Sequence, residues 1–425
     1  MRAPTAYDAP AVEALRDRPI SLLDKGFGGS ERTCERSARE IARAGLALHD
    51  GDFILPVMTL RQNALEHNIA AMARFCAEHG VELAPHAKTT MSPPLFARQL
   101  DAGAWGLTAA TVGHVQVYRA FGVGRVLLAN QLVDPAAIRW VMAERRRDPE
   151  FAFSCYVDGA DGIAILAAAA GHEDAPLDVL IELGHAGGRT GVRDDAAARD
   201  LARRILTTPG LRLAGVSAYE GSVGPVRTPE TLDGVAALCD RVAALAHELV
   251  PATGSFIVSA GGSAYPDVVA ERLSAARDVA VVVLRSGSYL THDHGMYAEV
   301  SPFARPDSAY ALRPALELWT HVLSHPEPGL ALLSIGRRDA PFDAGWPVPL
   351  RVRGRGGEVR PAGGMAVVHM NDQHAFLRLD DPGSVSVGEA LCLGISHPCT
   401  AFDKWRQLPV VDDRGIVVDV VPTFF

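Results

Sequence analysis

The middle of the chain contains the apolar run Val179-Leu180-Ile181-Glu182-Leu183, then a helix-like stretch from Asp194 to Leu206, then the apolar run Leu213-Ala214-Gly215-Val216. A nearly continuous apolar run is typical of a strand that is buried on both faces, and helices between such strands favour a parallel sheet. The alternation extends from about residue 56 to 290, with another helix-like stretch from Thr231 to Leu249. The other apolar runs are Val57-Met58-Thr59-Leu60, Val81 to Ala84, Trp105-Gly106-Leu107, Val126-Leu127-Leu128-Ala129, Phe153-Ser154-Cys155-Tyr156-Val157, Phe256-Ile257-Val258 and Val281-Val282-Val283-Leu284. We count eight or nine strand–helix units, which fits a closed (β/α)8 barrel better than an open sheet, and a ninth strand would lie outside the barrel.

The pattern changes after about residue 305. Apolar runs at Leu316 to Val322, Leu330 to Ile335, Met365 to Met370 and Val418 to Val421 are separated by turn residues and show little helical periodicity. This pattern predicts an antiparallel β domain. We therefore expect an α/β protein with an N-terminal extension (1–50) that packs on the β domain, a barrel (51–305) and a C-terminal antiparallel β domain (306–425).

Composition restricts the class of protein. The chain has 425 residues, of which 48% are hydrophobic and 21% charged, and this is ordinary for a globular protein with large cores. A net charge of -9 argues against a nucleic-acid partner. No apolar run is long enough to span a membrane, and the first residues lack the apolar segment of a signal peptide, so we expect a cytoplasmic protein. The six cysteines are scattered, and we expect free thiols.

A lysine follows one of the predicted barrel strands. The segment Pro85-His86-Ala87-Lys88-Thr89-Thr90 comes directly after the run Val81 to Ala84. Barrel enzymes present reactive groups at this end of their strands, and an amine there can form a Schiff base. A lone lysine after a strand is more often a solvated surface charge, so the assignment of Lys88 depends on the other motifs.

A second cluster, His397-Pro398-Cys399, lies in the predicted β domain. Side chains at i and i+2 of an extended segment point to the same face, so the imidazole and the thiol can reach one metal ion. Packing is the alternative, because a free cysteine often behaves as a small hydrophobic residue. A Schiff-base lysine and a soft metal site in one chain suggest a pyridoxal phosphate enzyme whose metal helps a substrate oxygen to leave.

Two glycine-containing loops are candidates for the cofactor phosphate. The loop Ser259-Ala260-Gly261-Gly262-Ser263 follows a predicted strand and precedes a helix-like segment from Asp267 to Leu273. Glycines let the backbone approach an anion closely, and barrel enzymes often bind phosphate after their late strands. The loop Arg285-Ser286-Gly287-Ser288-Tyr289 follows the next strand and would close the same pocket. An ordinary strand-to-helix turn is the alternative for the first loop.

Two further loops are candidates for the cofactor ring. Arg189, in the loop from Glu182 to Gly191, would need an acceptor if it were buried, and the phenolic oxygen of the cofactor would be one. The alternative is a solvated loop arginine. Tyr219-Glu220-Gly221 ends another strand and would also reach the ring. All of these loops follow predicted strands, which is where barrel enzymes build their sites.

Together, these motifs resemble those of the fold-type III pyridoxal phosphate enzymes, whose barrel is similar to that of alanine racemase. More closely, the chain resembles the family of D-serine dehydratase and D-threonine aldolase, in the long form of bacterial amino acid deaminases. The resemblance rests on Pro85-His86-Ala87-Lys88-Thr89, Gly188-Arg189-Thr190-Gly191, Tyr219-Glu220-Gly221, Gly261-Gly262-Ser263, Arg285-Ser286-Gly287-Ser288-Tyr289 and His397-Pro398-Cys399, and it extends from about residue 55 to the C-terminus. The glycine-rich stretch after His185 and the residues around Arg337-Arg338-Asp339 depart from the family pattern, which leaves the substrate open.

The resemblance implies roles for these residues. Lys88 would hold pyridoxal 5'-phosphate as a Schiff base, and Arg189 would contact the phenolic oxygen. The phosphate would be bound by Gly261, Gly262, Ser263, Gly287, Ser288 and Tyr289. Tyr219 would lie near the ring nitrogen, with Arg285 as the alternative. His397 and Cys399 would bind a metal. In this family His-x-Cys resembles the zinc-dependent dehydratases and His-x-Asp the manganese-dependent aldolases, and a thiolate suits Zn²⁺ while a carboxylate suits Mn²⁺.

These observations predict a zinc-dependent dehydratase that converts D-serine or a similar 3-hydroxy D-amino acid to a 2-oxo acid and ammonia. A metal-dependent D-threonine aldolase is the main alternative, and a racemase is the third. A non-catalytic barrel protein that binds the cofactor is an alternative from another class, but the second domain and its His-x-Cys pair argue against it. The resemblance also implies a homodimer in which each β domain covers the partner's barrel.

Overall fold

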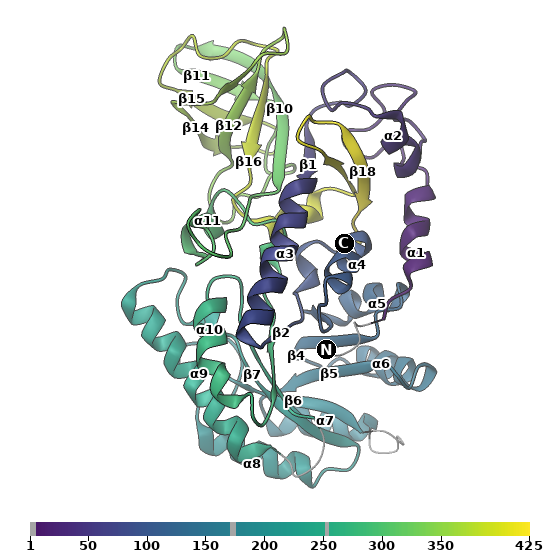
Figure 1. Cartoon of the computed structure of the whole chain (residues 1–425), viewed down its shortest axis with the longest axis vertical. Coiled ribbons are helices and arrows are strands. Elements are labelled where there is room, and N and C mark those ends of the chain that lie inside the picture. Colours follow the sequence, from purple (N-terminus) through teal and green to yellow (C-terminus); the bar gives the residue numbers. More distant parts are fainter. Residues whose placement is uncertain (1–5, 171–175, 251–254) are drawn as a thin grey trace.

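The computed structural model describes residues 6–170, 176–250 and 255–425. These residues form a closed parallel barrel and a second domain built around an antiparallel sheet (Figure 1). The predicted fold class is thus confirmed. In the described residues, no helix is both long enough and apolar enough to cross a membrane.

Eight parallel strands form the barrel, in the order β2-β9-β8-β7-β6-β5-β4-β3. The ring closes where His86, just after β2, pairs with Thr108 of β3. The strands are β2 (Glu82–Leu83), β3 (Leu107–Ala109), β4 (Arg125–Gln131), β5 (Ala152–Val157), β6 (Leu177–Leu183), β7 (Leu211–Ala218), β8 (Ile257–Ala260) and β9 (Val281–Leu284). The helices around them are α3 (Gln62–His79), α4 (Pro93–Asp101), α5 (Val112–Ala120), α6 (Pro135–Arg147), α7 (Ala160–Ala170), α8 (Asp195–Leu206), α9 (Pro229–Leu249) and α10 (Pro266–Leu273).

Helix α8 shows why these segments fold as they do. The Asp194 side chain caps its first turn by accepting a hydrogen bond from the Ala197 N–H. Its buried residues recur every three or four positions and face the barrel: Ala198, Leu201, Ala202 and Ile205. Inside the barrel, a separate apolar cluster contains Ala84, Trp105, Leu127, Tyr156, Leu180, Ala214, Ile257 and Val283. The barrel is therefore packed on both faces of its sheet, as the apolar strands predicted.

The predicted strand that does not belong to the barrel is β1 (Val57–Arg61). It pairs antiparallel with β10 (Leu316–Glu327) and parallel with β17 (Gln407–Val411), at the centre of the second sheet. The expectation that one of nine strands lies outside the barrel is confirmed. The segment 51–305 thus contains one strand of the other sheet.

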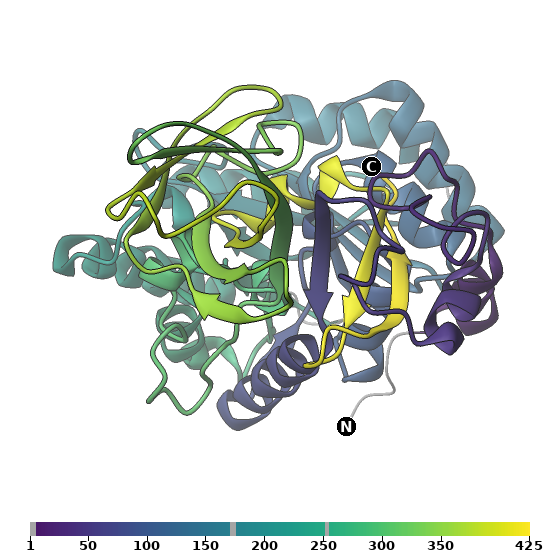
Figure 2. The ribbon, with the colours of Figure 1, turned by 90° about the horizontal axis from the view of Figure 1, so that it is seen from above.

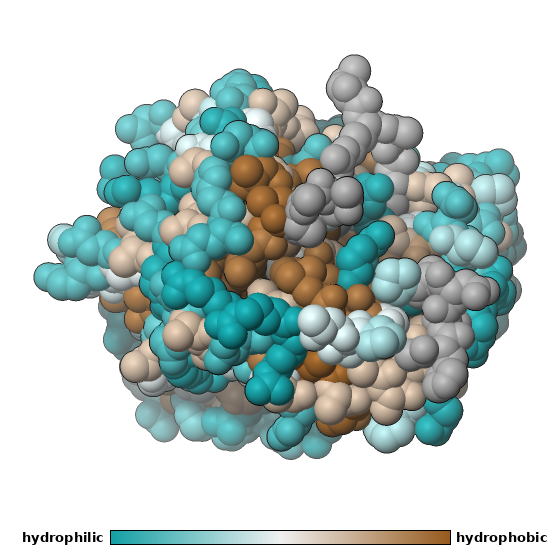
Figure 3. Space-filling view, turned by 90° about the horizontal axis from the view of Figure 1, so that it is seen from below, coloured by the Kyte–Doolittle hydropathy of each residue, from teal (hydrophilic) through white to brown (hydrophobic). Residues whose placement is uncertain are grey.

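The second sheet has ten strands, and its main path runs β13-β12-β16-β10-β1-β17-β18, with β11, β15 and β14 joined through β10. The strands not yet described are β11 (Leu330–Leu333), β12 (Val348–Arg353), β13 (Val359–Pro361), β14 (Met365–Met370), β15 (Ala375–Leu379), β16 (Ala390–Gly394) and β18 (Val417–Pro422). Figure 2 shows this sheet from above, over the barrel. The opposite face of the molecule, seen from below in Figure 3, carries an apolar area between hydrophilic side chains and faces away from the second domain.

The N-terminal segment contacts both domains. Ile20, Phe27 and Ile41 belong to one apolar cluster with Trp319 and Val420 of the second sheet. Ile41 lies in helix α2 (Ala38–Ala44), whereas helix α1 (Ala9–Glu13) packs against α4 of the barrel. This segment therefore contacts the barrel as well as the β domain on which we expected it to pack.

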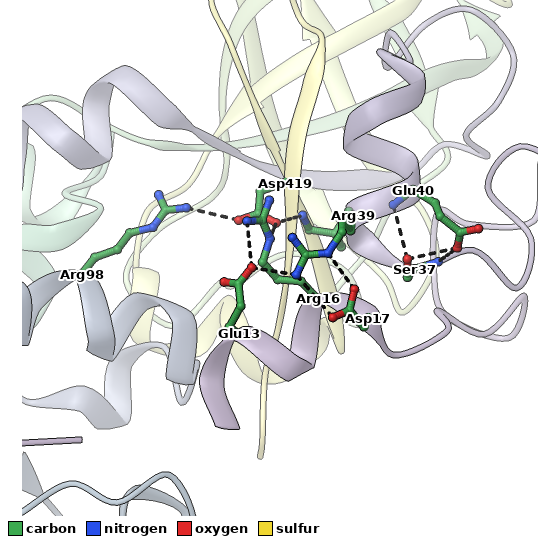
Figure 4. A network of polar contacts seen from close by, with 9 residues as sticks. Glu13, Arg16, Asp17, Ser37, Arg39, Glu40, Arg98 and Asp419 are labelled. Carbon is green, nitrogen blue, oxygen red and sulfur yellow. Dashed lines mark hydrogen bonds and ion pairs between the residues drawn. The ribbon is translucent and has the colours of Figure 1, made fainter. Parts of the chain in front are cut away.

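An ion-pair network joins the three parts of the chain (Figure 4). The Asp419 carboxylate of β18 lies 3.2 Å from Arg16 Nε and 3.4 Å from an Arg98 guanidinium nitrogen in α4. Arg16 follows α1, and the neighbouring Arg39 of α2 pairs with Asp17 at 2.7 Å. Burial raises the pKa of Asp419, and the two arginines oppose this shift. Asp419 thus links the β domain to the N-terminal segment and to the barrel.

Candidate active site

A cavity of about 560 Å³ lies at the carboxyl ends of the barrel strands, between the barrel and the second domain. Its lining includes most of the site residues predicted from the sequence: Lys88, Arg189, Tyr219, Gly262, Ser263, Gly287, Ser288, His397 and Cys399. Residues more than three hundred positions apart therefore meet in one cavity. Gly261 and Tyr289 are not part of its lining. The volume is within the range of small-molecule sites.

Lys88 lies in a single 3-10 turn, Ala87–Thr89, directly after β2. The chain has three lysines in all. The Lys25 amine donates to the Arg338 carbonyl and pairs with Asp339, and the Lys404 amine lies 3.7 Å from Asp403. In the described part of the chain, the Lys88 amine has no hydrogen-bond or ion-pair partner. Lys88 is thus the lysine whose amine is available inside the cavity.

The loop after β6 and the end of β7 bring Arg189 and Tyr219 together. The Arg189 guanidinium lies over the Tyr219 ring, 4.5 Å from its centre. Arg189 and Tyr219 are both exposed, Tyr219 to 36%. Stacking on an aromatic ring holds a guanidinium in place while its N–H groups stay available.

Glu220, the residue after Tyr219, was not predicted as a site residue. Its side chain is completely buried, and its carboxylate accepts hydrogen bonds from the N–H groups of Gly261, at 3.0 Å, and Gly262, at 2.6 Å. These are the N–H groups that the sequence suggested for the phosphate. Because Glu220 occupies them, the donors of this loop that remain open toward the cavity begin at Ser263.

The two loops after β8 and β9 lie side by side. The Ser288 N–H donates to Ser263 Oγ at 3.2 Å. Gly287 approaches the backbone of His86 so closely that a Cβ atom would lie 2.4 Å from the His86 carbonyl oxygen. Tyr289 turns away from the cavity, accepts a hydrogen bond from Gln99 and lines a different cavity between α3 and α4.

Arg285 lies at the base of the cavity and is 6% exposed. Its guanidinium donates to Ser217 Oγ, Ser259 Oγ and the Ala218 carbonyl, at 3.2, 2.7 and 2.7 Å. In the residues that the structure covers, no carboxylate pairs with it. A buried cation without an anionic partner is unfavourable unless a further acceptor binds it. Tyr156, whose ring lies near Arg285, lines the same part of the cavity.

His397 and Cys399 belong to a short segment after β16, and both line the cavity. Cys399 Sγ lies 3.2 Å from Thr89 Oγ1 and 3.4 Å from Ser288 Oγ, and His397 also hydrogen-bonds to it. The other ring nitrogen of His397, Nδ1, lies 2.6 Å from Asp343 Oδ2. The predicted metal pair of the β domain is therefore next to the barrel loop that contains Lys88.

This pair has perturbed acidities. Burial opposes both charged forms, but hydrogen bonds from His397, Ser288 and Thr89 outweigh it and lower the pKa of the Cys399 thiol. Burial would also lower the pKa of His397, yet the bonds to Cys399 and Asp343 raise that pKa to about 9. The hydrogen bonds within this pair therefore favour the charged forms of both side chains, a thiolate and an imidazolium.

The donor set fits a metal ion that keeps open positions. A soft thiolate and an imidazole nitrogen suit Zn²⁺, and a carboxylate on the second ring nitrogen of a ligand histidine is a common supporting contact. Among the described residues, no group of three or more His, Cys, Asp or Glu side chains could hold a metal. The protein would therefore supply two ligands, and substrate or water would supply the rest.

The barrel side of the cavity fits pyridoxal phosphate. His86 Nδ1 is buried and has no hydrogen-bond partner in the described residues, and Arg285 lacks an anion. Burial and the nearby Lys88 keep the pKa of His86 well below its usual value. The cofactor has an aldehyde for an amine, an anionic phosphate and a ring that needs polar partners, and the cavity offers all three kinds of group.

Two further cavity residues were not singled out from the sequence. His114, in the first turn of α5, accepts the Ala110 N–H at Nδ1, which leaves its Nε2 as a donor. Tyr297 lies in helix α11 (Met296–Val300), where its hydroxyl hydrogen-bonds to Ser288 beside Cys399. No local pattern marks either residue, because their positions depend on how the barrel loops fold back over the cavity.

Comparison with known proteins gives two family matches. The alanine racemase N-terminal domain matches residues 60–277, and a putative serine dehydratase domain matches residues 315–411. A D-threonine aldolase from Arthrobacter sp is 30% identical over 374 residues, which are 86% of this chain and 90% of the aldolase. A D-threo-3-hydroxyaspartate dehydratase from Delftia sp. (strain HT23) is 28% identical over 388 residues, which are 85% of this chain and 95% of the dehydratase.

Solved structures share the fold. The crystal structure of a D-threonine aldolase from Filomicrobium marinum superposes with a TM-score of 0.73 at 24% identity, over 88% of this chain and 95% of that one. A variant of the Delftia dehydratase, with a cysteine replaced by alanine and in the metal-free form, superposes with a TM-score of 0.68 at 24% identity, over 87% of this chain and 97% of that one.

Proposed function

Since the chain belongs to the alanine racemase-like, fold-type III pyridoxal phosphate enzymes, in the group of D-threonine aldolase and D-threo-3-hydroxyaspartate dehydratase, we propose that it is a metal-dependent D-amino acid dehydratase. Membership of this group makes the chain a lyase that acts on D-amino acids. The substrate that we propose is D-serine or a similar 3-hydroxy D-amino acid, and the products are a 2-oxo acid and ammonia. The observation that supports this proposal best is the position of Cys399 beside Thr89, next to Lys88.

Each side of the cavity has a separate task in this proposal. Bound pyridoxal phosphate would supply an electron sink for negative charge at Cα of the substrate. Lys88 would bind the cofactor and would move the Cα proton, since its amine has no partner in the described residues. Arg189 and Tyr219 would orient the ring from one side, and Arg285 would contact it from below. Ser263 and Ser288 would donate to the phosphate.

The β domain would act on the leaving oxygen. Hydroxide is a poor leaving group, and a metal ion held by His397 and Cys399 would supply Lewis acidity to the β-oxygen. Asp343 would hold the His397 ring in the orientation that a metal needs. We propose Zn²⁺ as this ion because a thiolate favours a soft metal. The metal-free form described for the Delftia variant fits a metal in that relative.

A product assay tests the reaction. Purified enzyme with pyridoxal phosphate is supplied with D-serine and D-threonine after chelation and reconstitution with Zn²⁺ or Mn²⁺. We expect keto acid and ammonia with Zn²⁺. Glycine and an aldehyde as the main products would contradict the dehydratase and support the second candidate, an aldolase, which the 30% identity to D-threonine aldolase favours. Full activity in the chelated protein would exclude a metal role.

The three lysines allow a matched test of cofactor attachment. Borohydride reduction should fix the cofactor to the wild-type chain and to Lys25→Ala and Lys404→Ala, but not to Lys88→Ala. Mass spectrometry of the reduced chains gives the result. A fixed adduct in Lys88→Ala would show that the lysine assignment is wrong.

The homodimer and the role of Cys399 as a metal ligand are tested by separate measurements. A homodimer with each β domain over the partner's barrel predicts twice the chain mass of 45.2 kDa in sedimentation equilibrium.

Cys399→Asp replaces a soft thiolate ligand with a harder carboxylate. The metal preference should therefore shift from Zn²⁺ toward Mn²⁺ while keto acid production falls. Retention of Zn²⁺ and the full rate in this variant would mean that Cys399 is not a ligand.

A further inference from the structure

We propose that Thr89 is a positioning residue, whose hydroxyl donates to the Cys399 thiolate and ties the metal pair of the β domain to the cofactor turn of the barrel. This inference rests on the proposed function. Thr89 lines the cavity and follows Lys88 directly, but neither the cofactor contacts nor the metal pair predicted from the sequence include it.

The turn that contains Lys88 packs against the turn that contains Cys399. These turns are Ala87–Thr89 of the barrel and Pro398–Thr400 of the β domain. Between them, Thr89 Oγ1 lies 3.2 Å from Cys399 Sγ. Thr89 is 2% exposed, and within the described residues its hydroxyl makes no other hydrogen bond. The Thr89 hydroxyl therefore serves the sulfur alone, shielded from solvent.

Metal chemistry fixes the direction of this hydrogen bond. A cysteine that binds a metal is a thiolate, which can only accept. The Thr89 hydroxyl has one hydrogen to give, so it is the donor once Cys399 is a ligand. Hydrogen bonds to a charged acceptor are stronger than those between neutral groups. The contact across the domain boundary thus favours the form of Cys399 that binds the metal.

Ser288 cannot replace Thr89 in the holoenzyme. Ser288 Oγ lies 3.4 Å from Cys399 Sγ, but it also hydrogen-bonds to the Tyr297 hydroxyl, and in the proposed function it donates to the cofactor phosphate. One hydroxyl hydrogen cannot be given to the phosphate and to the sulfur at the same time. With the cofactor bound, Thr89 is the hydroxyl that remains for the thiolate.

The backbone holds Thr89 in place. Its N–H donates to the His86 carbonyl at 3.3 Å, and the Met91 N–H donates to the Ala87 carbonyl at 3.0 Å. These bonds close the turn on both sides of Lys88. The Thr89 hydroxyl therefore holds the thiolate in a fixed position relative to the backbone of the cofactor lysine.

Three variants of the holoenzyme test this role. Thr89→Val removes the donor and keeps the shape of the side chain, whereas Thr89→Ser keeps the donor. Thr90→Val is the matched control, because Thr90 is also 2% exposed but its hydroxyl accepts the Ser92 N–H at 3.4 Å and does not contact the sulfur. In competition with a chromophoric chelator, we expect Thr89→Val to bind Zn²⁺ about tenfold more weakly. Thr89→Ser and Thr90→Val should bind Zn²⁺ as the wild type does.

A spectrum of the Co²⁺-substituted protein reports on the sulfur itself. A hydrogen bond stabilises the lone pairs of a thiolate, so its loss lowers the energy of the thiolate-to-Co²⁺ charge-transfer band. We expect this band to move to longer wavelength in Thr89→Val and to stay in place in Thr89→Ser and Thr90→Val. The visible absorbance of the cofactor should be unchanged in all three variants, since the Lys88 amine does not contact Thr89 Oγ1. Thr89→Ala also removes the donor and should give the same shift if valine disturbs the turn.

The outcomes separate this inference from the proposed function. An unchanged affinity for Zn²⁺ and an unmoved band in Thr89→Val would overturn the inference alone. A loss of affinity in Thr90→Val as large as in Thr89→Val, or no recovery in Thr89→Ser, would also overturn it, because packing of the turn would then explain the effect. A wild-type Co²⁺ spectrum without a thiolate band would overturn the metal site of the proposed function, and the inference with it.

Discussion

The Asp343→Asn variant tests whether the carboxylate of Asp343 orients the His397 ring for metal binding. Asp343 Oδ2 lies 2.6 Å from His397 Nδ1, and Oδ1 accepts the Thr400 hydroxyl at 2.7 Å. Both carboxylate oxygens therefore act as acceptors. An asparagine has one oxygen, so it can accept from His397 or from Thr400 but not from both. If its amide nitrogen faces Nδ1, the ring loses the contact that keeps Nε2 free for a metal.

The magnitude follows from this contact. A hydrogen bond to a charged group contributes about 1.5–3 kcal/mol. The Asp343 side chain is 44% exposed, and solvent screening reduces its contribution to about 1–2 kcal/mol. Because 1.4 kcal/mol corresponds to a factor of ten, the affinity for Zn²⁺ should fall about 5- to 30-fold. Cofactor binding should change little, since Asp343 does not line the cavity at Lys88.

Competition with a chromophoric zinc chelator at fixed pH measures the affinity, and keto acid production measures the rate. Asp372→Asn is the matched control, because Asp372 lies in the same domain and pairs at 3.5 Å with an exposed arginine. Its affinity for Zn²⁺ should equal that of the wild type. If Asp343→Asn binds Zn²⁺ as tightly as the wild type and keeps its rate, Asp343 does not orient His397, and the metal assignment loses its supporting contact.

Three other changes have defined outcomes. Asp419→Asn should lower the free energy of unfolding in urea by about 1–2 kcal/mol, because Arg98 loses this anion and Arg16 keeps only the exposed Glu13. Asp17→Asn, in an exposed pair, should change the free energy of unfolding little. Equal effects of the two substitutions would contradict the role of the buried network. Burial raises the pKa of Asp293 to about 7, although three backbone N–H groups oppose the shift. The protonated carboxyl therefore stabilises the folded state fully below about pH 4, and this stabilisation is lost as the pH rises through about 7. Asp293→Asn should remove that part of the pH dependence, and urea midpoints at several pH values between 4 and 8 that decline in parallel for both proteins would show the assignment to be wrong. Glu220→Gln leaves the N–H of Gly261 or Gly262 without its acceptor. In fluorescence titrations, we expect this variant to bind pyridoxal phosphate about tenfold more weakly, with a smaller change for pyridoxal. An equal loss of affinity for both ligands would mean that this loop does not bind the phosphate.

The barrel and its helices were predictable because their signals are local. Helix α8 shows its cap, its apolar face and its end within thirteen residues of sequence, and the apolar strands around it lie between clear breaks. The order of parallel strands follows from chain order in a barrel, so the loops after Val216 and Val258 could be expected at one end. For this reason Lys88, Arg189 and Tyr219 could be expected to line one cavity, as they do.

Long-range contacts were not predictable in this way. Glu220 is next to a predicted residue, but its carboxylate takes the Gly261 and Gly262 N–H groups only because β7 and β8 are adjacent and of suitable register. Asp343 is 54 positions from His397, in a segment without a recognisable pattern. Tyr289 was expected at the phosphate, yet its side chain points to Gln99, since neighbouring residues of a single helical turn face different ways.

Strand β1 makes the two domains depend on each other during synthesis. Leu60 pairs with Leu316 and with Val410, which follow it by more than 250 positions. At about 5–20 residues per second, a ribosome needs roughly 13–50 s to extend the nascent chain from Leu60 to Leu316. During that time the barrel strands emerge and can pair with one another, whereas β1 has no partner strand on either side, because β10 and β17 are not yet synthesised. A fragment that ends after the barrel would keep this unpaired apolar strand, so the barrel cannot be released from the full chain by a single cut without leaving an aggregation-prone edge.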